Sequence, residues 1–120
     1  MSHILVATDS DDIAEEAFAA LASFGTMVSR VHKGEDVREA VSVLNPDVVI
    51  LDLQIGNMGG VATSIDLRHE QEAGRLNPVK ILMLLDREAD QWIAKEAKVD
   101  AELVKPLDAF QLRKITESLL

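Results

Sequence analysis

Short apolar runs alternate with longer amphipathic segments along the whole chain, and five of each can be placed. This alternation is typical of repeated βα units, which build a mostly parallel sheet with helices on both faces. The predicted strands are His3–Thr8, Thr26–Val31, Val48–Asp52, Lys80–Leu85 and Ala101–Val104. The predicted helices are Asp12–Phe24, Gly34–Leu44, Val61–Ala73, Ala89–Ala97 and Asp108–Leu120. The third and fourth strands are almost wholly apolar, which favours central positions covered on both faces.

Length and composition limit the classes of protein to which the chain can belong. A chain of 120 residues is near the commonest domain size, and no linker-like stretch divides it, so we expect one domain over residues 1–120 without an output domain. The absence of cysteine excludes disulfides and thiolate chemistry and favours a cytoplasmic location. The net charge of -9 argues against binding to nucleic acid or anionic membranes. No apolar run approaches the roughly 20 residues that span a bilayer.

Three of the predicted strands end in residues that suit phosphate chemistry. Asp9 follows the first strand, Asp52 closes the third, and Lys105 follows the fifth. Ligands of open α/β sheets bind outside the carboxyl ends of the strands, so we expect these side chains to converge if their strands are neighbours. Magnesium prefers oxygen ligands and often takes one or two carboxylates plus a phosphate oxygen. Lysine supplies a point charge for a phosphoryl group.

Three sequence blocks around these residues resemble the receiver domain of two-component response regulators, the CheY-like superfamily. They are the first-strand pattern ILVATD, the block PDVVILDLQIGNMGG and the terminal LVKPLD, which occur in the family's order and at nearly its spacing. The resemblance covers the whole chain and extends to the Lys105–Pro106 bond, which is cis-prone. It implies a five-stranded parallel sheet in the order 2-1-3-4-5 with helices on both faces.

The resemblance also implies a mechanism and a set of partners. Asp52 would be the phosphoacceptor, Asp9 and Asp52 would hold Mg²⁺ together with the backbone carbonyl of Gln54, and Lys105 would contact the phosphoryl group. Gln54 and Arg87 stand where the family tunes hydrolysis of the aspartyl phosphate. The donor would be a sensor histidine kinase or a phosphotransfer protein, and the output a downstream protein target. Apart from accepting and losing its own phosphoryl group, such a protein is not an enzyme.

The chain departs from the family's pattern at several positions. Thr8 replaces the first of two acids at the end of the first strand, so we expect weak Mg²⁺ affinity. Leu85 stands where the family has a switch serine or threonine, and residues 80–96 contain neither. Glu102 replaces the aromatic switch residue. Glycines in the segment Ile55–Gly60, where the family favours a proline and an acid, should loosen that loop.

These departures leave alternatives open. One is a receiver that is phosphorylated on Asp52, and another is a receiver-like interaction module that works without phosphorylation. In a third, Asp9, Asp52 and Lys105 are only a salt-bridged cluster at the strand ends. A haloacid-dehalogenase-like phosphatase would need an aspartate in place of Gln54, and a flavin site would need a phosphate-cradling loop where residues 8–12 are acidic. The chain meets neither requirement, so we expect neither function.

Protein contacts are expected on one surface. The resemblance assigns target binding or homodimerisation to the predicted helices Ala89–Ala97 and Asp108–Leu120 together with Glu102. Trp92 lies in the first of these helices, where it is either packed in the core or available as an anchor for a partner. The three histidines are scattered and show neither metal-ligand spacing nor a catalytic pairing.

Overall fold

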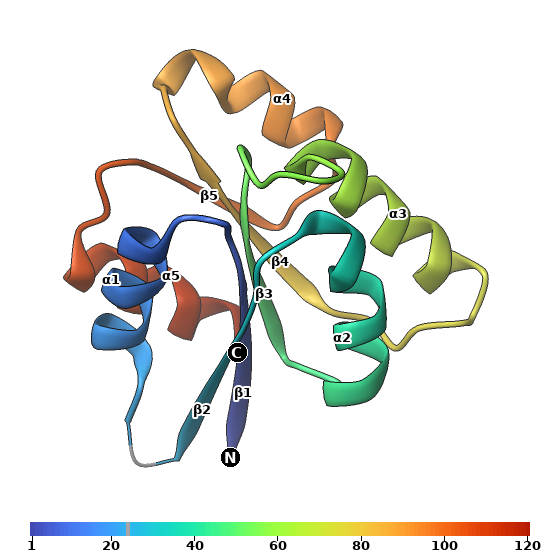
Figure 1. Ribbon diagram of the computed structural model, residues 1–120, viewed down its shortest axis with the longest axis horizontal. Coiled ribbons are helices and arrows are strands. Elements are labelled where there is room, and N and C mark those ends of the chain that lie inside the picture. Colours follow the sequence, from blue (N-terminus) through green and yellow to red (C-terminus); the bar gives the residue numbers. More distant parts are fainter. Residues whose placement is uncertain (24) are drawn as a thin grey trace.

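A sheet of five parallel strands forms the centre of the protein (Figure 1). The computed structural model describes residues 1–23 and 25–120. The strand order is β2-β1-β3-β4-β5, which confirms the predicted fold class and order. The strands are β1 (Ser2–Ala7), β2 (Thr26–Val31), β3 (Val48–Asp52), β4 (Lys80–Leu85) and β5 (Ala101–Val104). Four strands have the predicted bounds, and β1 lies one residue earlier, so that Thr8 follows the strand.

Among the described residues, four helices connect successive strands and a fifth follows β5, and short 3-10 turns precede two of them. The helices are α1 (Asp11–Leu21), α2 (Val37–Leu44), α3 (Gly60–Glu72), α4 (Gln91–Glu96) and α5 (Ala109–Leu119), and the turns are η1 (Gly34–Asp36) and η2 (Glu88–Asp90). The prediction was wrong at the end of α1, which stops at Leu21 because Ala22 is extended and Ser23 bridges Thr26. Phe24, the predicted last residue of that helix, lies outside the described residues. None of the helices that the structure describes could cross a bilayer.

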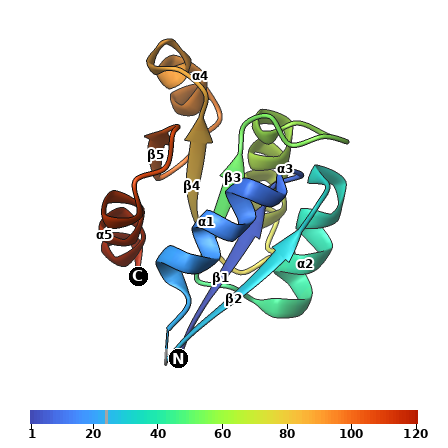
Figure 2. The same ribbon diagram turned by 60° about the vertical axis from the view of Figure 1, so that its left-hand side comes forward.

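Alternate side chains of the strands supply two separate hydrophobic layers. On one face, buried residues of β1, β3 and β4 pack against α2, α3 and α4 through Val37, Val41, Leu67 and Ala94. On the other face, the alternate residues pack against α1 and α5 through Ala17, Ala20, Leu21 and Leu112. Figure 2 shows these two layers of helices on either side of the twisted sheet. Each buried aliphatic side chain contributes about 1.5–3 kcal/mol relative to an exposed one. The loops at the carboxyl ends of the strands therefore stand on a rigid base.

Candidate functional site at the carboxyl edge of the sheet

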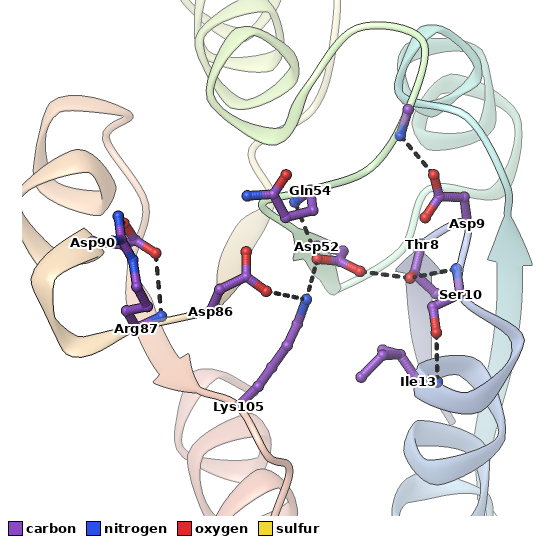
Figure 3. Close-up of polar contacts among 11 residues, drawn as sticks. Thr8, Asp9, Ser10, Ile13, Asp52, Gln54, Asp86, Arg87, Asp90 and Lys105 are labelled. Atoms are coloured by element: carbon purple, nitrogen blue, oxygen red, sulfur yellow. Dashed lines mark hydrogen bonds and ion pairs between the residues drawn. The ribbon is translucent and has the colours of Figure 1, made fainter.

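Asp52 is the buried centre of a polar cluster at the carboxyl edge of the sheet (Figure 3). It is the last residue of β3 and is 2% exposed. Its Oδ1 accepts hydrogen bonds from Nζ of Lys105 at 2.7 Å and from the backbone N–H of Gln54 at 3.1 Å. Its Oδ2 accepts a hydrogen bond from the hydroxyl of Thr8 at 2.7 Å. Both oxygens of the carboxylate are thus held in a fixed orientation.

Lys105 reaches Asp52 across the end of an intervening strand. β4 lies between β3 and β5, so the long lysine side chain must span the end of β4. Its Nζ also donates to Oδ1 of Asp86, the first residue after β4, at 3.0 Å. Burial acts to lower the pKa of the Lys105 ammonium, but the hydrogen bonds and charges of Asp52 and Asp86 outweigh it and raise that pKa above its ordinary value. The ammonium therefore keeps its charge throughout the physiological pH range.

Thr8, which was predicted to replace the first of the family's two acids, is buried and presents a neutral hydroxyl. Its Oγ1 donates to Asp52 and accepts the backbone N–H of Ser10 at 3.1 Å. Its carbonyl accepts from Nε and Nη2 of Arg30 at 3.2 and 3.0 Å, which ties the end of β1 to β2. Thr8 therefore orients the Asp52 carboxylate but brings no negative charge to the site.

Asp9 lies at the neighbouring strand end, where its carboxylate contacts the loop after β3. Its Oδ2 accepts the backbone N–H of Gly56 at 3.0 Å, and Figure 3 shows Thr8 between the two aspartates. Within the part of the chain that the structure describes, no group of three or more His, Cys, Asp or Glu side chains is arranged to hold a metal ion. Asp9 and Asp52 still supply two hard oxygen donors at adjacent strand ends. This donor set fits Mg²⁺, which keeps several waters and needs only one or two carboxylates.

The loop after β3 is docked against η1. The backbone N–H of Gly34 donates to the carbonyl of Gly56 at 3.0 Å, and that of Glu35 donates to the carbonyl of Asn57 at 2.9 Å. With the Gly56–Asp9 contact, three hydrogen bonds hold residues 56 and 57. The expectation that glycines loosen this loop is therefore not supported by its contacts.

Asp86 belongs to the cluster, although the sequence did not single it out. It follows β4, as Lys105 follows β5, and the register pairs Leu85 with Val104. The residues after these partners therefore leave the sheet side by side. Oδ2 of Asp86 is buried and has no hydrogen-bond partner among the described residues. The strand pairing is the signal that could have identified Asp86 in advance.

Leu85 and Glu102, which were predicted to stand at the family's switch positions, and Arg87, predicted to tune hydrolysis, take part in the packing and hydrogen bonds of the fold. Leu85 is fully buried in the core, and its carbonyl accepts the backbone N–H of Lys105 at 2.8 Å. Glu102 is half-buried on the edge strand β5, opposite Met83. Arg87 pairs with the buried Asp90 through its backbone N–H and its guanidinium, both at 3.2 Å, and so closes the turn that begins α4.

Two large apolar side chains are exposed on the fourth and fifth helices. Trp92 on α4 is 66% exposed and Phe110 on α5 is 69% exposed. The interpretation of Trp92 as a core residue is therefore wrong, and its alternative as an anchor for a partner stays a prediction.

Sequence comparisons identify a family for the chain. The family model for the response regulator receiver domain matches residues 4–117. The protein PilH of Pseudomonas aeruginosa is 28% identical over all of this chain and 98% of its own length. The transcriptional regulatory protein CseB of Streptomyces avermitilis is 29% identical over 89% of this chain, which spans only 44% of that relative.

The fold has close counterparts among solved structures. The chemotaxis protein CheY4 of Vibrio cholerae superposes with a TM-score of 0.85 over all of this chain and 99% of its own, at 22% identity. A response regulator from Chloroflexus aurantiacus, described as putative, gives 0.87 over 98% and 96% of the two chains, at 23% identity. With the family match over nearly its full length, the chain belongs to the response regulator receiver domains of two-component signalling.

Proposed function

We propose that the protein is a phosphorelay receiver that accepts a phosphoryl group on Asp52 in a Mg²⁺-dependent reaction. The observation that carries this proposal is the 2.7 Å contact between Lys105 Nζ and Asp52 Oδ1 at the carboxyl edge of the sheet, with Asp9 at the adjacent strand end. A sensor histidine kinase or a phosphotransfer protein would be the donor, and a downstream protein target would read the result. A cytoplasmic location and a homodimer through α4 and α5 are further parts of the proposal.

The chemistry is a nucleophilic substitution at phosphorus. An oxygen of the Asp52 carboxylate forms the new O–P bond while the P–N bond of a phosphohistidine, or the P–O bond of an acyl phosphate, breaks. The leaving imidazole takes up a proton, whereas an acyl phosphate releases a carboxylate. Positioning and charge compensation account for most of the catalysis of such transfers. Thr8 and the Gln54 N–H orient the nucleophile, and the Lys105 ammonium lies where it can compensate charge on the phosphoryl oxygens.

Magnesium would be held by the carboxylates of Asp9 and Asp52 and the backbone carbonyl of Gln54, and when bound would neutralise charge on the phosphoryl oxygens. Because Thr8 is neutral, this ligand set has one carboxylate fewer than the family's pattern. We therefore expect weak Mg²⁺ affinity. The output must also work without a switch hydroxyl, since Leu85 is a core residue. These two features favour the interaction module as the second candidate function.

Intact-protein mass spectrometry distinguishes the two candidates. The protein is incubated with acetyl phosphate and Mg²⁺, and in parallel with a chelator. We expect one added phosphoryl group only when Mg²⁺ is present, and reductive trapping of the acyl phosphate should place it in the peptide that contains Asp52. If neither acetyl phosphate nor a phosphorylated histidine donor modifies the protein, the interaction module is the correct function.

Replacing Thr8 by aspartate should strengthen Mg²⁺ binding about tenfold, because affinity at such sites follows the number of charged ligands. The same variant should be less stable without metal, since a third carboxylate then stands beside the buried Asp52. Calorimetric titration and thermal melts with and without Mg²⁺ measure both effects. Ser42→Asp adds the same charge at an exposed position of α2 and should change neither. Equal Mg²⁺ affinities for Thr8→Asp and the wild type would show that Thr8 is not at the metal site.

A further inference from the structure

Among the described residues, Lys105 is the only hydrogen-bond partner of the Asp86 carboxylate. The same lysine also contacts Asp52. Lys105 Nζ lies 3.0 Å from Asp86 Oδ1 and 2.7 Å from Asp52 Oδ1. The side chain of Asp86 is 34% exposed, but its Oδ2 is buried and accepts no hydrogen bond within the described structure. Asp86 therefore depends on the lysine that the proposed phosphoryl transfer requires.

The charges at this edge of the sheet oppose the approach of an anionic donor. Asp9, Asp52 and Asp86 bring three negative charges and Lys105 brings one positive charge, while the Arg30 guanidinium beside Thr8 is paired with Asp11. A phosphoryl group that binds Lys105 must share the ammonium with Asp86 or displace it. Displacement would leave a partly buried carboxylate without a donor, which is unfavourable. In the turn that follows, the Arg87 guanidinium contacts Asp90 and not Asp86.

We propose that Asp86 is a positioning residue that acts as an electrostatic brake on phosphoryl transfer to Asp52. It withholds part of the Lys105 charge from the phosphoryl group and repels the anionic donor. This inference rests on the proposed function of Asp52 and extends it, because it assigns a regulatory role to a residue outside the set of acceptor, metal ligands and lysine.

Replacing Asp86 by asparagine tests the brake. The amide keeps the size of the side chain and an acceptor for Lys105 but removes the charge. We expect Asp86→Asn to be phosphorylated by acetyl phosphate about three- to tenfold faster than the wild type, as the loss of one like charge at a partly buried site implies. The matched control is Glu88→Gln, which makes the same change at an exposed position of the same loop and should leave the rate unchanged.

Three further measurements separate a brake from a merely structural role. Beryllofluoride, a non-covalent stand-in for the phosphoryl group, should bind Asp86→Asn more tightly by a similar factor. The difference in rate should shrink between about 10 mM and about 500 mM salt, because screening weakens charge repulsion. Asp86→Glu, which restores the charge, should behave like the wild type. Unchanged melting temperatures would show that the fold is intact.

Each outcome is decisive. A faster reaction of Asp86→Asn than of the wild type supports the brake. If the wild type is phosphorylated and Asp86→Asn reacts no faster than Glu88→Gln, the inference is overturned while the proposed function stands. If the wild type is modified by neither acetyl phosphate nor a phosphohistidine donor, the proposed function falls and the brake with it.

Discussion

Asp52→Asn is expected to accept no phosphoryl group from any donor. The variant should still fold and keep its surface for protein contacts. The amide lacks the nucleophilic carboxylate oxygen but can keep the local hydrogen bonds. Its oxygen can accept from Lys105, and its NH₂ can donate to the hydroxyl of Thr8, which both contact Asp52 now. Intact-protein mass spectrometry after incubation with acetyl phosphate and Mg²⁺ measures the effect as a complete loss of the added mass.

Stability measurements on the same variant test the salt-bridge interpretation. Removing one partner of a buried ion pair often costs about 3–5 kcal/mol, because the other charge is left unpaired. Lys105 still contacts Asp86 here, so we expect Asp52→Asn to lose only about 1–2 kcal/mol of unfolding free energy, the scale of altered hydrogen bonds. Asp12→Asn, an exposed change of the same kind on α1, should affect neither property. A variant that still acquires one phosphoryl group would place the acceptor elsewhere.

The strands were predictable because burial fixes their composition. β3 and β4 are buried on both faces, so their apolar runs coincide with the strands, and prolines at positions 46 and 78 stand shortly before them. The end of α1 carries no comparable signal. Residues 22 and 23 are ordinary helix-compatible residues, and their extended structure depends on the bridge from Ser23 to Thr26 at the start of β2. This bridge joins residues only three positions apart, so it is a local turn contact that the residue types at positions 22 and 23 do not specify by themselves.

The candidate site was predictable at strand ends and unpredictable where loops meet. Asp52, Thr8 and Lys105 converge because the parallel register places their strand ends at one edge. The orientation of Asp9 depends instead on the loop after β3, whose Gly56 N–H takes up its carboxylate. The place of Asp86 beside Lys105 follows from the strand register, but the direction of its side chain depends on how the turn after β4 leaves the sheet. Side-chain directions in connecting loops follow from packing between segments that are distant in the sequence.

Gly34→Ala should be the most destabilising of the substitutions considered, because no space exists for a methyl group. A Cβ at Gly34 would lie 1.7 Å from the backbone carbonyl oxygen of Met58 and 2.7 Å from Oγ1 of Thr63. The carbonyl is itself held by the Thr63 hydroxyl at 3.0 Å, and the Gly34 N–H binds Gly56. The loop after β3 would have to move away from η1. We expect a loss of about 2–3 kcal/mol, the usual scale of overpacking.

Thermal melts and Mg²⁺ titration together measure this effect. A loss of that size lowers the melting temperature by about 10 °C in a domain of this length. Mg²⁺ binding should also weaken, since the displaced loop carries the Gly56 N–H that orients Asp9 and lies just after Gln54. The matched control is Gly59→Ala in the same loop, where an added Cβ meets nothing within 4 Å and φ is -58°. That variant should change stability by at most about 1 kcal/mol, the scale of an N-cap substitution. If the melting temperatures of Gly34→Ala and Gly59→Ala agree within about 2 °C, the loop can move away from η1 at little cost. Its docking on η1 would then not hold the site together.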